Sequence, residues 1–183
     1  MTNIVYIATS LDGFIARPNG DIDWLNNIPN PTNSDFGYNE FINRIDGVLM
    51  GRNTYEAVRE FGSWPYTQPV FILSNTLETL PEELNNKAEI VKGELKDIIK
   101  SLKMRKINNL YVDGGKTVQS FLKEDLIDEM IITTVSILLG EGIPLFGDMD
   151  GDKIGDLKFN CEKVEFINQH LVKHYYKRDV IKD

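Results

Sequence analysis

Short apolar runs recur along the chain and alternate with stretches whose apolar positions fall three or four residues apart. The runs predict buried β-strands, since consecutive apolar and β-branched residues between turn formers are typical of strands covered on both faces. The three- and four-residue spacing predicts amphipathic helices. The predicted strands cover residues 4–8, 48–50, 69–73, 88–91, 110–112 and 130–135.

Helices are expected between most of these strands, at about 34–44, 51–61, 95–102 and 116–122. This alternation predicts an α/β fold whose mostly parallel sheet carries helices on both faces. Two later runs, 157–166 and 170–176, alternate apolar and polar residues, which predicts a terminal antiparallel hairpin at one edge. Neither a repeat nor a linker divides the sequence, so one domain over residues 1–183 is expected.

At one place a predicted strand runs through paired glycines straight into a helix. Gly114 and Gly115 follow strand 110–112, and Lys116 comes next. Glycine lets a ligand approach the backbone, and the free N–H groups and dipole of a first helical turn favour an anion. The pattern predicts a phosphate or pyrophosphate site, with a tight turn that binds nothing as the alternative.

The stretch Gly51–Arg52–Asn53–Thr54 repeats this arrangement after strand 48–50, again with a glycine, a cation and a helix start. Two such corners suit a ligand that carries more than one phosphate. By itself, Arg52 could equally be a surface cation.

The loop between residues 9 and 25 combines turn formers with large apolar side chains. Asp12-Gly13 and Asn19-Gly20 are turn dipeptides, whereas Phe14, Ile15 and Trp24 need an apolar surface to contact. A lid over a ligand and a loop packed on the core both satisfy this pattern.

Composition narrows the classes of partner. Hydrophobic residues make up 42% and charged residues 26%, and the net charge is −8. Such a chain is typical of a soluble globular protein and is poorly suited to a broad nucleic-acid or anionic-membrane surface. Without a leader or an apolar run of about 20 residues, a cytoplasmic location is expected.

Several kinds of chemistry are disfavoured, and no metal is expected. His170 and His174, the only histidines, would lie ~13 Å apart on a strand, too far to ligate one metal. Cys161 has no partner for a disulfide and reads as a packing residue. Neither GxGxxG nor GxxxxGK[ST] is present. The aspartates at 148, 150 and 152 are better explained as an acidic turn than as a calcium loop.

Six segments, in this order and at these spacings over residues 4–146, resemble the dihydrofolate reductase-like superfamily. The strongest resemblance is to stand-alone proteins similar to the C-terminal reductase domain of the bifunctional riboflavin-biosynthesis enzyme. The segments are IVYIATSLDGFIA, DWL, VLMGRNTYE, FILSN, YVDGGKTVQSFL and DEMIITTVSILLGEGIPLF.

The resemblance implies a three-layer α/β/α fold and an NADPH cofactor. It places the Gly-Gly turn at the cofactor pyrophosphate, where the peptide between the glycines is commonly cis. It places Arg52 at the ribose 2′-phosphate and the loop from Leu11 to Trp24 as a lid. The cofactor-binding residues implied in this way are Ala8, Ile15, Ala16, Gly51, Arg52, Asn53, Thr54, Ser74, Asn75, Gly114, Gly115, Lys116 and Thr117.

On the substrate side the resemblance implies Trp24, Asp35 and Thr133. Asp35 matches the catalytic carboxylate of the folate enzymes, and Thr133 matches its usual threonine partner. An acid favoured by the dipole at a helix start is the alternative for Asp35.

The function implied by the resemblance is NADPH-dependent reduction of a small heterocyclic or sugar-linked substrate, such as an aminopyrimidine carrying a ribosyl phosphate. Dihydrofolate reduction and a non-catalytic NADP(H)-binding module are the alternatives. A phosphate-bearing substrate would need a second cationic pocket, to which Arg17 or Lys153 could contribute. The resemblance also implies a homodimer, with the terminal strands as a possible interface.

Overall fold

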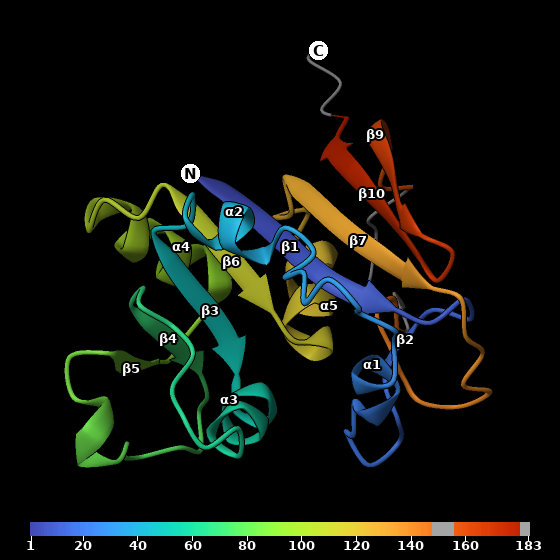
Figure 1. Ribbon diagram of the computed structural model, residues 1–183. Helices are drawn as coiled ribbons and strands as arrows, with labels where there is room; N and C mark the ends of the chain where they lie inside the picture. Colours follow the sequence, from blue (N-terminus) through green and yellow to red (C-terminus); the bar gives the residue numbers. More distant parts are fainter. Residues whose placement is uncertain (148–155, 180–183) are drawn as a thin grey trace.

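The computed structural model describes residues 1–147 and 156–179, so the turn at 148–152 and Lys153 lie outside the described residues. Eight strands form its central sheet: β1 (Thr2–Thr9), β3 (Gly47–Gly51), β4 (Val70–Leu73), β5 (Ala88–Val91), β6 (Asn109–Asp113), β7 (Glu129–Val135), β9 (Phe159–Asn168) and β10 (Leu171–Arg178). They are arranged in the order β5-β4-β3-β6-β1-β7-β10-β9 (Figure 1).

The sheet is parallel from β5 to β7, and its far end is antiparallel. β10 runs antiparallel to β7 and pairs with β9 in the terminal hairpin, at the end of the sheet opposite β5 (Figure 1). The predicted mostly parallel sheet with a C-terminal antiparallel hairpin is therefore confirmed.

Both faces of the parallel strands are apolar, because successive side chains on a strand point to opposite faces. Leu49 and Val112 pack with helices α4 (Leu95–Met104) and α5 (Gly115–Lys123) in one cluster. Val48 and Tyr111 pack with α2 (Tyr38–Ile42) and α3 (Arg52–Arg59) in another. This explains why these strands read as continuous apolar runs.

Helix α2 is shorter than the predicted helix at 34–44. Phe36 and Gly37 have positive φ angles, 51° and 83°, so the chain turns there and the helix begins at Tyr38. Other short elements were not predicted: α1 (Asp23–Asn26), η1 (Glu82–Leu84), and the small antiparallel pair of β2 (Phe14–Ala16) and β8 (Ile143–Pro144).

The chain order brings two distant corners together. β6 comes after β1 and β3 in the sequence, but in the sheet it lies between them. The carboxyl ends of β3 and β6 are therefore neighbours, and each leads directly into its helix, α3 or α5 (Figure 1). Ligands of open parallel sheets bind at such edges. Across 1–147 and 156–179, the helices are all too short or too polar to cross a membrane.

Candidate functional site

A cavity of about 880 Å³ opens at the carboxyl ends of β1, β3 and β6. Both glycine corners line it, although more than 60 residues of sequence separate Arg52 from Gly115. Every cofactor residue implied by the resemblance lines this cleft except Ser74 and Asn75. Those that do are Ala8, Ile15, Ala16, Gly51, Arg52, Asn53, Thr54, Gly114, Gly115, Lys116 and Thr117.

The two corners fit against each other through a glycine and a threonine from each side. A Cβ atom on Gly51 would lie 3.0 Å from Thr117 Oγ1, and one on Gly114 would overlap Thr54 Oγ1. Gly114 also has φ 89° and ψ 135°, a conformation essentially confined to glycine. Within the described residues every peptide bond is trans, so the expected cis peptide between Gly114 and Gly115 is wrong.

The first turns of α3 and α5 are electrostatically open to an anion. Neither turn contains an acidic residue, and neither helix has a side-chain cap on its free N–H groups. By contrast, α1, α2 and α4 each carry an acid in the first turn. Uncapped N–H groups and the helix dipole favour negative charge, and Arg52 and Lys116 add positive charge at the same two places.

The Arg52 side chain donates hydrogen bonds to two residues that the sequence analysis did not identify. Its Nε donates to Glu56 Oε1 at 2.7 Å, and its Nη1 donates to Thr76 Oγ1 at 3.3 Å. Ser74 is buried, and its hydroxyl accepts hydrogen bonds from the backbone of Thr76 and Leu77. Ser74 thus supports the turn that holds Arg52, and it does not face the cleft itself.

The loop predicted as a lid forms one wall of the cleft and is fastened to the opposite loop. β2 pairs with β8, and Ile15 packs so closely on Gly115 that a Cβ there would lie 2.8 Å from Ile15 Cδ1. The Asp12 carboxylate accepts hydrogen bonds from the backbone N–H groups of Leu139 and Gly140. Ile15 and Ala16 line the cleft as expected, and movement of the loop stays a prediction.

The three residues expected to bind substrate do not line the cofactor cleft. Trp24 is only 2% exposed because it packs on Val135 and Leu171. Asp35 is exposed at the start of α2, where its carboxylate accepts hydrogen bonds from the Asn39 and Gly37 N–H groups, which lower its pKa. Thr133 lies in β7, directly beside Ala8 of β1.

Asp113 is a carboxylate in the cleft that sequence reasoning missed. It ends β6, immediately before the paired glycines, and lines the cavity. Burial raises the pKa of Asp113, although a hydrogen bond from the Gly114 N–H to Oδ1 at 2.8 Å partly opposes this. The available signal was an acid at the carboxyl end of a buried strand, which is the usual position of functional residues in parallel sheets.

The sheet order, the hairpin and the double corner define the dihydrofolate reductase-like class of α/β folds. The family model described as the RibD C-terminal domain matches residues 2–173, and the chain belongs to this family.

Among solved structures, a Shewanella sp. PV-4 protein provisionally named a riboflavin biosynthesis protein is 50% identical, with a TM-score of 0.93 over 98% of this chain and 100% of that one. The Thermotoga maritima diaminohydroxyphosphoribosylaminopyrimidine deaminase/5-amino-6-(5-phosphoribosylamino)uracil reductase shares the fold at 20% identity and a TM-score of 0.74, over 97% of this chain and 56% of that one. The uncharacterized protein YwjB of Bacillus subtilis is 33% identical over 93% of this chain and 97% of its own length.

The contact between the corners predicts that Gly114→Ala destabilises the protein by about 2–4 kcal/mol, through backbone strain and overlap with Thr54. Urea unfolding measures the loss. Gly62→Ala is the matched control, since Gly62 has φ 80° but open space around its Cβ position. Adding Thr54→Ala should recover part of the loss from Gly114→Ala. Equal stability of the two glycine variants would show that the corners do not constrain each other.

Proposed function

We propose that the protein is an NADPH-dependent reductase of the riboflavin-biosynthesis type, which transfers hydride to a small heterocyclic, sugar-linked substrate. The supporting observation is that Arg52 and the Gly114-Gly115 turn line one cavity. Family membership supports the same class of reaction. The alternatives of dihydrofolate reduction and of a non-catalytic NADP(H)-binding module predict different results in the experiment below.

The residues present fit a dinucleotide phosphate. The uncapped first turn of α5 and Lys116 would hold the pyrophosphate, since close approach there needs the glycines. Arg52, with Nη2 outside its bonds to Glu56 and Thr76, would meet the 2′-phosphate. Ala8, Ile15 and Ala16 would enclose the nicotinamide ring. When bound, NADPH supplies the hydride.

Asp113 is the candidate proton donor in place of Asp35. Reduction of a C=N or C=O bond adds hydride to carbon and a proton to nitrogen or oxygen. A donor must hold its proton near neutral pH, which a raised pKa favours. Asp35 has a lowered pKa and is held by the N–H groups of α2, so it is poorly suited to donate.

The function is tested by following NADPH oxidation with an aminopyrimidine riboside, its 5′-phosphate and dihydrofolate. We expect turnover with a member of the riboside pair, and a kcat that falls as pH rises through the pKa of Asp113, since only the protonated acid donates. Asp113→Asn should lower kcat roughly 10²–10⁴-fold and remove this pH dependence. Asp35→Asn is the comparison variant and should retain both the wild-type kcat and its pH dependence.

Turnover with dihydrofolate alone would instead identify a folate reductase. Tight NADPH binding without turnover of any of the three compounds would favour the non-catalytic module. If Asp35→Asn reproduced the loss expected for Asp113→Asn, the acid would be assigned to Asp35.

Arg52→Ala is expected to weaken NADPH binding by about 1.5–3 kcal/mol, the scale of a hydrogen bond to a charged group, and NADH binding much less. Fluorescence titration of both cofactors measures the difference. Arg59→Ala, on the same helix but outside the cleft, should leave both affinities unchanged. Equal losses of affinity for NADPH and NADH would show that Arg52 does not bind the 2′-phosphate.

We also propose that two copies of the chain associate along β9. This strand ends the sheet and leaves one backbone edge without a neighbouring strand among the described residues. Phe166 and Val164, 73% and 58% exposed, add apolar surface to that edge. Exposed apolar edge strands are favourable sites for pairing with another chain.

Light scattering of the purified protein should therefore give about twice the chain mass of 20.9 kDa. Phe166→Lys should shift the protein toward the monomer, because the added charge would be buried against the partner. Met104→Lys, at a 74% exposed position on α4, is the matched control. A monomeric wild-type protein would refute the proposed dimer.

A further inference from the structure

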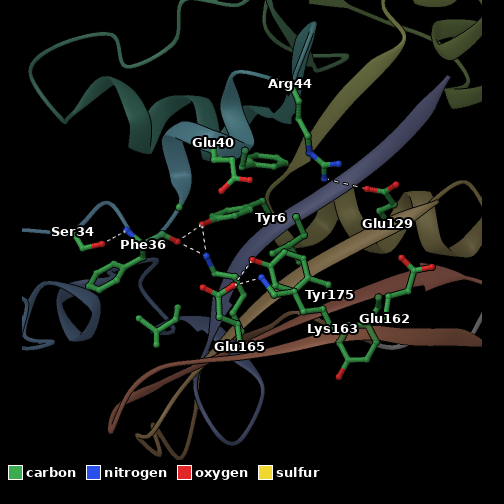
Figure 2. A pocket seen from close by; sticks show the side chains of 16 residues that line it. Tyr6, Ser34, Phe36, Glu40, Arg44, Glu129, Glu162, Lys163, Glu165 and Tyr175 are labelled. Carbon is green, nitrogen blue, oxygen red and sulfur yellow. Dashed lines mark hydrogen bonds and ion pairs between the residues drawn. The ribbon is translucent and has the colours of Figure 1, made fainter.

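A second cavity of about 510 Å³ lies between α2 and the sheet, over β1, β7, β10 and β9. Figure 2 shows Tyr6, Glu165 and Tyr175 pointing toward one another there from three different strands. Arg44 and Glu129 form an ion pair away from this group. The lining thus combines aromatic rings with hydroxyl, carboxylate and amino groups.

The second cavity adjoins the cofactor cleft. Tyr6 lines both spaces. On the same face of the sheet, Ala8, Thr133, Lys173 and Glu165 are successive neighbours across β1, β7, β10 and β9. This row begins at a residue of the cofactor cleft and ends at two residues of the second cavity. A substrate that meets the nicotinamide beside Ala8 would therefore reach the second cavity past Tyr6, the residue that lines both spaces.

The cations around the second cavity already have partners. Lys173 is 2% exposed, and its ammonium donates to the Tyr6 hydroxyl at 3.0 Å and to the Phe36 carbonyl oxygen. Arg44 pairs with Glu129 at 3.1 Å, and Lys163 pairs with Glu165 at 2.8 Å. Burial also lowers the pKa of Lys173, so its ammonium group is less strongly favoured in the charged form that would attract a phosphate.

The acids around this cavity outnumber the cations. Its lining contains four glutamates, Glu40, Glu129, Glu162 and Glu165, against the three cations Arg44, Lys163 and Lys173. Glu40 and Glu162 form no ion pair with any residue in the described part of the chain. Arg17, expected as a possible phosphate ligand, pairs instead with Asp23 at 2.5 Å in the lid loop.

We propose that the second cavity binds an uncharged, polyhydroxylated part of the substrate, such as an unphosphorylated ribosyl group, and selects against a phosphate in the same position. Sugar hydroxyls both donate and accept, so they match carboxylate, phenol and ammonium groups together. A phosphate would place negative charge beside Glu40 and Glu162, which form no ion pair with the described residues. The inference rests on the proposed function, because the neighbouring cleft must hold the nicotinamide.

The test compares two ligands that differ only in the phosphate: 5-amino-6-(ribosylamino)uracil and its 5′-phosphate. Each is titrated by calorimetry into protein saturated with NADP⁺, so that no hydride is transferred. We expect the riboside to bind about tenfold or more tightly than its phosphate, since juxtaposed like charges are costly. Equal or tighter binding of the phosphate would overturn the inference.

Charge-removing variants test the cause of the selectivity. The double variant Glu40→Gln/Glu162→Gln should bring the two affinities to within about threefold, because it removes the two negative charges that have no ion pair among the described residues. Glu82→Gln/Glu83→Gln removes the same charge from η1, outside both cavities, and should leave the tenfold ratio intact. A ratio that the first double variant does not change would overturn the charge argument even if the wild-type preference is observed.

The same samples distinguish failure of this inference from failure of the proposed function. NADP⁺ is titrated into the free protein before the riboside is added, and absence of NADP⁺ binding in that step would overturn the reductase proposal itself. Binding of NADP⁺ without binding of the riboside would leave the cofactor cleft intact and reject the second cavity as a substrate site. That result would also be expected if a second copy of the chain covered the cavity.

Discussion

The insertion of β6 between β3 and β1 is the constraint on which the candidate site depends. It places two strand-to-helix corners side by side, and they meet so closely that Gly51 faces Thr117 and Gly114 faces Thr54. A side chain at Gly114 would overlap the Thr54 hydroxyl and force the two helix starts to shift, and one at Gly51 would press on Thr117. The open N–H groups of α3 and α5, and the cations beside them, would then no longer converge on one ligand.

Local charge, more than total charge, differentiates the two cavities. The chain carries a net charge of −8, yet the first turns of α3 and α5 contain no acid and two cations stand beside them. The lining of the first cavity contains a single acid, Asp113, whereas the second cavity has four glutamates against three cations, and two of these glutamates have no ion pair within the described residues. The first arrangement favours a phosphorylated cofactor, whereas the second favours an uncharged group. Under the proposed function, the first cavity would hold the cofactor and the second would hold the sugar of the substrate.

Sequence reasoning succeeded where the signal was local. The strand at 88–91 and the helix beginning at Leu95 appear as predicted, because apolar spacing reports directly which face is buried. It failed where tertiary contacts decide. The expected helix at 34–44 shrinks to Tyr38–Ile42, since the Phe36 carbonyl turns inward to accept from Lys173 and Tyr6. Trp24 was assigned to substrate, but its indole fills a small core cluster.

The sequence by itself determined the alternation of strands and helices, the two glycine corners and the cations beside them, since each depends on residues close together in the chain. Only the tertiary structure decided that both corners face one cavity and that Asp113 lines the same cavity. It also decided that the Asp35 carboxylate accepts a hydrogen bond from the start of α2, and that Lys173 is buried beside Tyr6. Those facts depend on which strands become neighbours. Strand order is set by packing across the whole sheet, which no local pattern records.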